Sequence, residues 1–156
     1  MATLKERLRA DLTDALRSRD EIALATLRMA LAAVTRAEVA GAEQVVLSDD
    51  QVVGVLRSEL AKRTEAAEFY AGAGRQELAA RERAEAEILT RYLPAQVDDA
   101  ALAGVVAEEV ERAAADGMTG PKAMGPIIKA VRERVGQGAA GGRIADAVKR
   151  ALAAGS

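Results

Sequence analysis

The residue types that most often carry enzymatic chemistry are missing from this chain. It contains no histidine and no cysteine, which removes the commonest general base, the commonest metal ligand and every thiolate or disulfide. Carboxylates are plentiful and could bind Mg²⁺ or act as bases, but no Ser or Thr has an evident base partner. We therefore expect no catalytic residue, no metal site and no cofactor.

Basic residues near the C-terminal end are the remaining candidates, and their chemistry would be binding. Residues 1–97 hold 14 basic and 16 acidic residues, residues 98–116 hold one and six, and residues 117–156 hold seven and two. The last segment thus has a net charge of +5, although the whole chain has −2. The candidate nucleic-acid-binding residues are Lys122, Lys129, Arg132, Arg134, Arg143, Lys149 and Arg150.

The spacing of these cations favours a basic face. Lys122, Lys129 and Arg132 are seven and three residues apart, so a continuous helix would put them on one side. Arg143, Lys149 and Arg150 lie opposite the apolar stripe of a short final helix. Such a face suits a phosphate backbone, and the lack of aromatic residues predicts contacts with backbone and shape rather than with unpaired bases. From spacing alone, a solvated face that keeps a small core soluble explains the pattern equally well.

Two other features are weaker candidates for binding. The glycine-rich "GQGAAGG" at residues 136–142 lacks the Lys-Ser/Thr of a P-loop and the strand that precedes a Rossmann turn, so it does not predict nucleotide binding. The acidic residues Glu108, Glu109 and Glu111 are interpreted as the solvent-exposed face of their helix.

The elements that position these residues should all be helices. Ala, Leu, Glu, Arg and Gln dominate, strand formers are sparse, and no long window alternates apolar and polar residues. Capping boxes begin at Thr3 and Ser48, while Asp20 and Asp98 can cap two further helices. Glutamate precedes arginine by four residues, the favourable order on exposed helix faces, in the pairs Glu59–Arg63, Glu77–Arg81 and Glu87–Arg91.

The sequence "RYLPAQ" predicts a joint. Pro94 lacks an N–H and disfavours helical geometry at Leu93, so the preceding helix should stop there. Tyr92 should pack at the helix end with its hydroxyl in water. We predict an all-α protein with an N-terminal domain of about four helices, residues 1–95, and a small C-terminal domain of about three, residues 96–156.

Neither end of the chain predicts a membrane protein. The N-terminus is charged and has no apolar segment of signal-peptide length, and no window approaches the roughly 18 apolar residues of a membrane span. We expect a cytoplasmic protein.

Three stretches carry a resemblance to a known family. They are "LRMALAAVTRAEV" (27–39), "SELAKRTEAAEFYAGAGRQELAARERAEAEILTRYLPAQVDDAAL" (58–102) and "KAMGPIIKAV" (122–131). The most specific run joins Phe69, Gly74, Arg75, Leu78, Glu85, Ile88, Leu89, Tyr92, Leu93 and Pro94. Over nearly its whole length the chain resembles the YqeY family, small bacterial cytosolic proteins similar to the C-terminal region of the GatB subunit of glutamine-dependent aspartyl/glutamyl-tRNA amidotransferase.

The resemblance implies an accessory role in RNA binding. In the amidotransferase the corresponding tail docks on tRNA, while the catalytic centres lie in other domains that have no counterpart here. The implied function is a non-catalytic module that binds tRNA or another structured RNA, with a role linked to tRNA-dependent amidation. A departure lies in the loop before the last helix, where family members carry basic residues and an Asp but this chain has Gln137, Ala139 and Gly141. Lys122 and Lys129 remain at matching places, as does Arg143.

Two alternatives stay open. Apolar stripes along the predicted helices, and the acidic helix that follows Asp98, fit a protein-interaction module that docks to an enzyme or to a second copy, without RNA. The family resemblance also permits a label of carbon–nitrogen ligase with glutamine as amido-N-donor, although no catalytic centre is visible.

Overall fold

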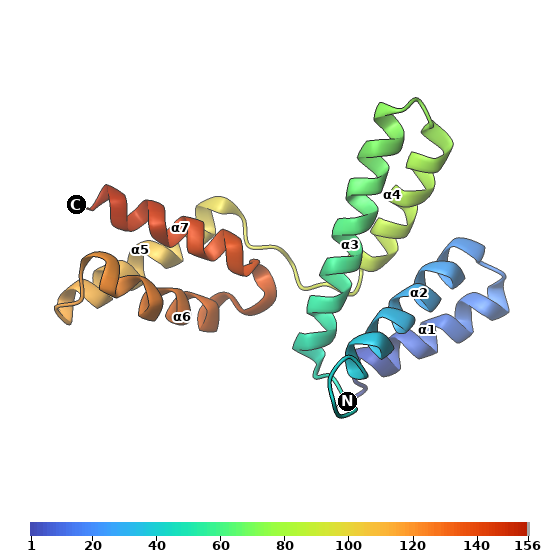
Figure 1. Ribbon diagram of the computed structural model, residues 1–156, viewed down its shortest axis with the longest axis horizontal. Coiled ribbons are helices and arrows are strands. Elements are labelled where there is room, and N and C mark those ends of the chain that lie inside the picture. The colour runs from blue at the N-terminus through green and yellow to red at the C-terminus, as the bar shows by residue number, and fades with distance from the viewer. Residues whose placement is uncertain (156) are drawn as a thin grey trace. The chain divides into compact units, whose positions relative to one another are not determined.

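The computed structural model describes residues 1–155, and all its regular elements are helical (Figure 1). Seven α-helices and two short 3-10 helices are present, and no residue of this range forms a strand. The expected all-α fold, with four α-helices followed by three, is confirmed. None of the described helices is both long enough and apolar enough to cross a membrane.

The chain divides into two compact units, Met1–Leu93 and Pro94–Ser156. We call them the N-terminal and C-terminal units. The division falls two residues before the boundary expected from the sequence. Pro94 is thus the first residue of the second unit rather than part of the first.

The N-terminal unit consists of two helical hairpins (Figure 1). Its helices are α1 (Leu4–Ser18), α2 (Glu21–Glu38), α3 (Asp49–Gly72) and α4 (Gln76–Thr90). Helix α2 packs on α1 and also contacts both α3 and α4. The fully buried Leu8, Val34, Leu56 and Leu89 bring one side chain from each helix into a single core.

The expected caps begin four of the helices. Thr3 and Ser48 each form a complete capping box, at the start of α1 and α3. The Asp20 side chain accepts a hydrogen bond at the start of α2, and Asp98 does the same for α5 (Asp99–Ala115). These side chains satisfy backbone N–H groups that have no partner within the helix.

The C-terminal unit packs three helices around a second core. Its helices α5, α6 (Met124–Val135) and α7 (Gly141–Ala154) each contact the other two. The 3-10 helices η1 (Gly120–Ala123) and η2 (Gly136–Gly138) connect them. Val106, Ile127, Val131, Ile144 and Val148 are almost completely buried in this core.

The segment around Tyr92 differs from its expected structure. Helix α4 ends at Thr90, and the Tyr92 side chain is buried, with its hydroxyl donating a hydrogen bond to Asp11 Oδ2 at 2.5 Å rather than facing water. The Arg7 guanidinium lies 4.8 Å from the ring centroid. Burial, together with the hydrogen bond to the Asp11 carboxylate, raises the pKa of the Tyr92 phenol. Helix α1 supplies both partners, which lie about 80 residues away in the sequence and could not be inferred from the local motif.

Candidate nucleic-acid interface

Two of the expected cations lie on the outer side of α6, and a third lies just before it. Ile127 and Val131 bury one side of α6, which leaves Lys129 and Arg132 exposed. Lys122 is exposed as well, but it belongs to the 3-10 helix η1 rather than to α6. The seven-residue spacing from Lys122 to Lys129 therefore does not run through one continuous α-helix.

The last helix presents two more cations. Ile144, Ala147 and Val148 turn one side of α7 into the core. Lys149 and Arg150 are exposed on its surface. Helix α7 thus turns its apolar residues inward and exposes Lys149 and Arg150, two of the three cations expected on its basic side.

Five exposed cations remain unpaired in the C-terminal unit. Within residues 1–155, none of them lies within ion-pair distance of a carboxylate: Lys122, Lys129, Arg132, Lys149 and Arg150. An unpaired cation on the surface retains its full attraction for an anion, because no neighbouring carboxylate competes for it.

Arg134 is held by helix α5 instead. Its guanidinium donates to Glu108 Oε2 at 2.7 Å and to Glu109 Oε1 at 3.1 Å, and these hydrogen bonds raise its pKa above the ordinary value. Glu109 also accepts from Arg112 at 2.9 Å and is only 5% exposed. The expected solvent-exposed acidic face is therefore correct for Glu108 and Glu111 but wrong for Glu109, because α6 packs against that side of α5.

Arg143 is also engaged inside the unit. Its guanidinium donates to the Val97 carbonyl oxygen at 2.9 Å, to Asp99 Oδ1 at 2.8 Å and to Gln96 Oε1 at 3.2 Å. These three bonds fasten the start of α5 and the segment before it to the start of α7. Arg143 therefore contributes to the fold of the unit, and its charge is already shared with Asp99.

The glycine-rich loop serves close packing of the backbone. A Cβ atom on Gly138 would lie 2.6 Å from Val97 Cγ2, and the Val97 N–H donates to the Gly138 carbonyl oxygen at 2.7 Å. Gly136 has a φ of 54°, which favours glycine. A Cβ on Gly141 would lie 3.0 Å from Arg132 Nη2, so the Arg132 side chain reaches the start of α7.

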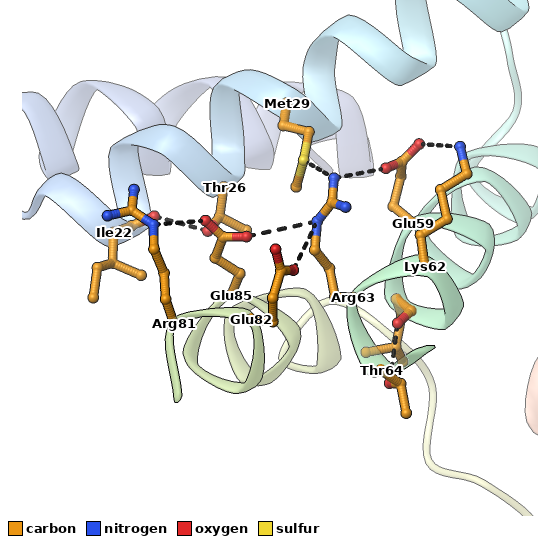
Figure 2. Close-up of polar contacts among 11 residues, drawn as sticks. Ile22, Thr26, Met29, Glu59, Lys62, Arg63, Thr64, Arg81, Glu82 and Glu85 are labelled. Carbon is orange, nitrogen blue, oxygen red and sulfur yellow. Dashed lines mark hydrogen bonds and ion pairs between the residues drawn. The ribbon is translucent and has the colours of Figure 1, made fainter. Parts of the chain in front are cut away.

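A polar network in the N-terminal unit was missed by the sequence interpretation (Figure 2). Arg63 on α3 pairs with Glu59 at 3.3 Å, and on α4 with Glu82 at 3.8 Å and Glu85 at 3.6 Å. It also donates to the Met29 sulfur on α2. The i,i+4 spacing revealed the Glu59–Arg63 pair, but Glu59 was placed on an exposed face and is in fact only 4% exposed.

A second polar link joins α1 to α2. The Glu38 carboxylate is 3% exposed, pairs with Lys5 Nζ and accepts a hydrogen bond from the Leu47 N–H at 3.2 Å. The Lys5 hydrogen bond, followed by that of Leu47, lowers the pKa of Glu38. Both links bring helices together, so we assign them to the stability of the unit and not to the candidate interface.

The five exposed cations suit the binding of an anion. Lysine and arginine side chains carry positive charge, so they attract phosphate groups. Among residues 1–155, no group of three His, Cys, Asp or Glu side chains is placed to hold a metal ion.

Comparison with known proteins gives one informative result. No curated protein sequence matches the chain. The family model described as Yqey-like protein matches residues 5–152, which is nearly the whole length. This match agrees with the resemblance carried by the stretches around Tyr92 and Lys122, and the chain therefore belongs to the YqeY family.

Proposed function

We propose that this YqeY-family protein is a non-catalytic, cytoplasmic accessory module that binds structured RNA, with tRNA as the expected ligand. The observation that carries the proposal is the set of five exposed, unpaired cations on the C-terminal unit. We call these five residues, which lie on η1, α6 and α7, the basic surface. Contacts from lysine and arginine to phosphates release counterions and supply most of the sequence-independent affinity for nucleic acid.

The composition of the basic surface favours a particular kind of RNA contact. Residues 117–156 contain no aromatic side chain, so the surface has nothing on which an unpaired base could stack. It is therefore suited to the backbone of a folded RNA, recognised by its shape. The family resemblance to the tail of a tRNA-dependent amidotransferase supports tRNA over other folded RNAs, and it suggests a role linked to tRNA-dependent amidation.

The test is a gel-shift titration of tRNA over a range of salt concentrations. We expect wild-type affinity to fall as salt rises, and the triple variant Lys122→Ala/Lys129→Ala/Arg132→Ala to bind more weakly. The slope of log affinity against log salt should become shallower by about 2–3, since each lost phosphate contact removes about 0.7–0.9.

A matched control removes three exposed cations from the N-terminal unit. Arg17, Arg28 and Arg83 are exposed and form no ion pair within residues 1–155. The variant Arg17→Ala/Arg28→Ala/Arg83→Ala loses the same net charge, and we expect it to bind tRNA nearly as the wild type does. Equal weakening by both triple variants would show that net charge, and not the basic surface, determines binding.

Catalysis of amidation by the chain alone is the alternative to test directly. Incubation with misacylated tRNA, glutamine and ATP should yield no amidated product, because the chain has no histidine or cysteine and, among residues 1–155, no group of three acidic side chains is placed to hold a metal ion. Formation of amidated tRNA would overturn the non-catalytic assignment.

A further inference from the structure

The closed end of the α3–α4 hairpin (Figure 1) carries exposed apolar side chains that the RNA proposal does not use. Phe69, in the last turn of α3, is 72% exposed, and Leu78, in the first turn of α4, is 39% exposed. Phe69 meets Tyr70 edge-on, with ring centroids 5.9 Å apart. The chain has only three aromatic residues, and it exposes its one phenylalanine here. Aromatic side chains of this kind supply much of the binding energy of protein interfaces.

Three acidic residues lie close to these apolar side chains along α3 and α4. Glu65, Glu68 and Glu77 are exposed, and none of them forms an ion pair within residues 1–155. Glu65 precedes Phe69 by four residues and so lies on the same side of α3. The expected Glu77–Arg81 pair is absent, because Arg81 pairs with Glu85 at 3.4 Å, and Glu77 stays free for an outside partner.

The end of the hairpin also contains a depression. It has a volume of about 500 Å³ and is lined by Gly74, Arg75, Gln76, Glu77 and Leu78. Arg75 is the only basic residue between positions 64 and 79, where three acidic residues give a net charge of −2. We call Phe69, Leu78 and the three glutamates the hairpin tip.

The charge of the hairpin tip selects among possible occupants. Three unpaired carboxylates repel the phosphates of RNA. They equally repel the hairpin tip of a second copy, so a symmetric dimer through this patch would bring like charges together. A protein surface that carries Lys or Arg around an apolar side chain complements both the carboxylates and the exposed Phe69.

We propose that the hairpin tip docks a protein partner through a basic amphipathic segment, with an apolar side chain of the partner entering the depression beside Leu78. This inference goes beyond RNA binding and does not rest on it, since it uses the other unit and the opposite charge.

The test uses the full-length protein and two fluorescent helical peptides. One peptide has a Leu-rich face flanked by Lys, and the other has Glu at every Lys position. Fluorescence anisotropy should show that the Lys peptide binds more tightly than the Glu peptide. Phe69→Ala should weaken binding of the Lys peptide by about tenfold, as expected when an interface anchor is truncated. Glu68→Lys/Glu77→Lys should reverse the preference between the peptides.

The control is an exposed apolar residue of the same unit that lies outside the hairpin tip. Leu16 on α1 is 57% exposed, and Leu16→Ala should leave peptide affinity unchanged. Because Phe69 and Leu16 are both exposed, we expect both variants to fold, and thermal unfolding of each variant is the check. Equal effects of the two substitutions, or equal affinity for the two peptides, would overturn the proposal.

Two further outcomes would identify a different occupant and also overturn the proposal. If Phe69→Ala weakens tRNA binding in the gel shift, the hairpin tip contacts RNA. If the wild type forms a concentration-dependent dimer in analytical ultracentrifugation and Phe69→Ala abolishes it, the hairpin tip joins two copies. Failure of the basic surface to bind tRNA would leave the peptide result unaffected, so the two proposals can be distinguished.

Discussion

The two units use their charged residues differently. In the N-terminal unit, the buried carboxylates Glu38 and Glu59 face cations, and Arg63 links three helices. In the C-terminal unit, Glu109 is the only buried acidic residue among those described. Arg134 joins α6 to Glu109 on α5, and Arg143 joins α7 to Val97 and Asp99. Five other cations of this unit are exposed and form no ion pair within residues 1–155.

The comparison shows that the net charge of a segment does not predict how many of its cations are exposed and unpaired. From the sequence, all seven cations of residues 117–156 were candidates for binding nucleic acid. In the folded unit, Arg134 and Arg143 are engaged with carboxylates, whereas Lys129 and Arg132 are not. A cation already held by a carboxylate has less to gain from a phosphate, since the carboxylate competes with it. The following predictions test this contrast between the units.

The largest expected effects concern the two cores, and they test whether the units are separate in stability as well as in contacts. Leu89 and Ile144 are fully buried, one in each unit. Leu89→Ala and Ile144→Ala should each lower the free energy of unfolding by about 2–5 kcal/mol. Hydrogen exchange measured by mass spectrometry should show the loss in the mutated unit alone. Equal loss of protection in both units would mean that they unfold as one.

The Arg63 network should matter more to stability than any surface ion pair. Arg63→Met leaves Glu59, Glu82 and Glu85 without their shared cation, and we expect a loss of about 1–3 kcal/mol in urea unfolding. The control is Arg83→Met, which replaces an exposed arginine of α4 and should change stability by less than about 0.5 kcal/mol. If both substitutions lowered the free energy of unfolding equally, Arg63 would contribute no more to stability than an exposed arginine does.

Gly138 tests the packing that holds the glycine-rich loop. Gly138→Ala places a methyl group against Val97, and overpacking of this kind costs about 1–3 kcal/mol. Gly142→Ala is the matched control, because a Cβ there meets no atom within 4 Å. We expect a lower thermal midpoint for the C-terminal unit with the first variant only. An unchanged midpoint for Gly138→Ala would indicate that the loop can shift to accommodate the methyl group, so that close packing against Val97 does not limit stability.

The smallest predicted effect is at Tyr92. Tyr92→Phe removes the hydrogen bond to Asp11 and should cost about 1 kcal/mol at neutral pH. The fold raises the pKa of the phenol above its ordinary value of 10.0, so this contribution should be complete below pH 10 and decline as the pH rises beyond it. Urea unfolding from pH 8 to pH 11 should show a steeper alkaline decline for the wild type than for Tyr92→Phe. Parallel curves would contradict the assignment of this dependence to Tyr92.

Local features of the sequence predicted the helices well. The caps at Thr3, Asp20, Ser48 and Asp98 are present as expected. A capping bond joins residues three positions apart, so the information needed to form it is contained in a short stretch. Helix α6 begins at Met124, and Pro126 lies in its first turn, where a missing N–H costs no hydrogen bond within the helix.

Partners that are distant in the sequence were beyond such reasoning. The Tyr92 hydroxyl meets Asp11, Arg134 meets Glu109, and Arg63 meets Glu85 instead of staying at the surface. Each contact depends on which sides of two helices face each other, and helical periodicity alone leaves that choice open. The amino-acid order thus specified where helices begin and how many form, because those bonds are local. The packing of the helices determined which charged side chains are buried in ion pairs and which stay exposed, because burial depends on which helix faces meet in the folded chain.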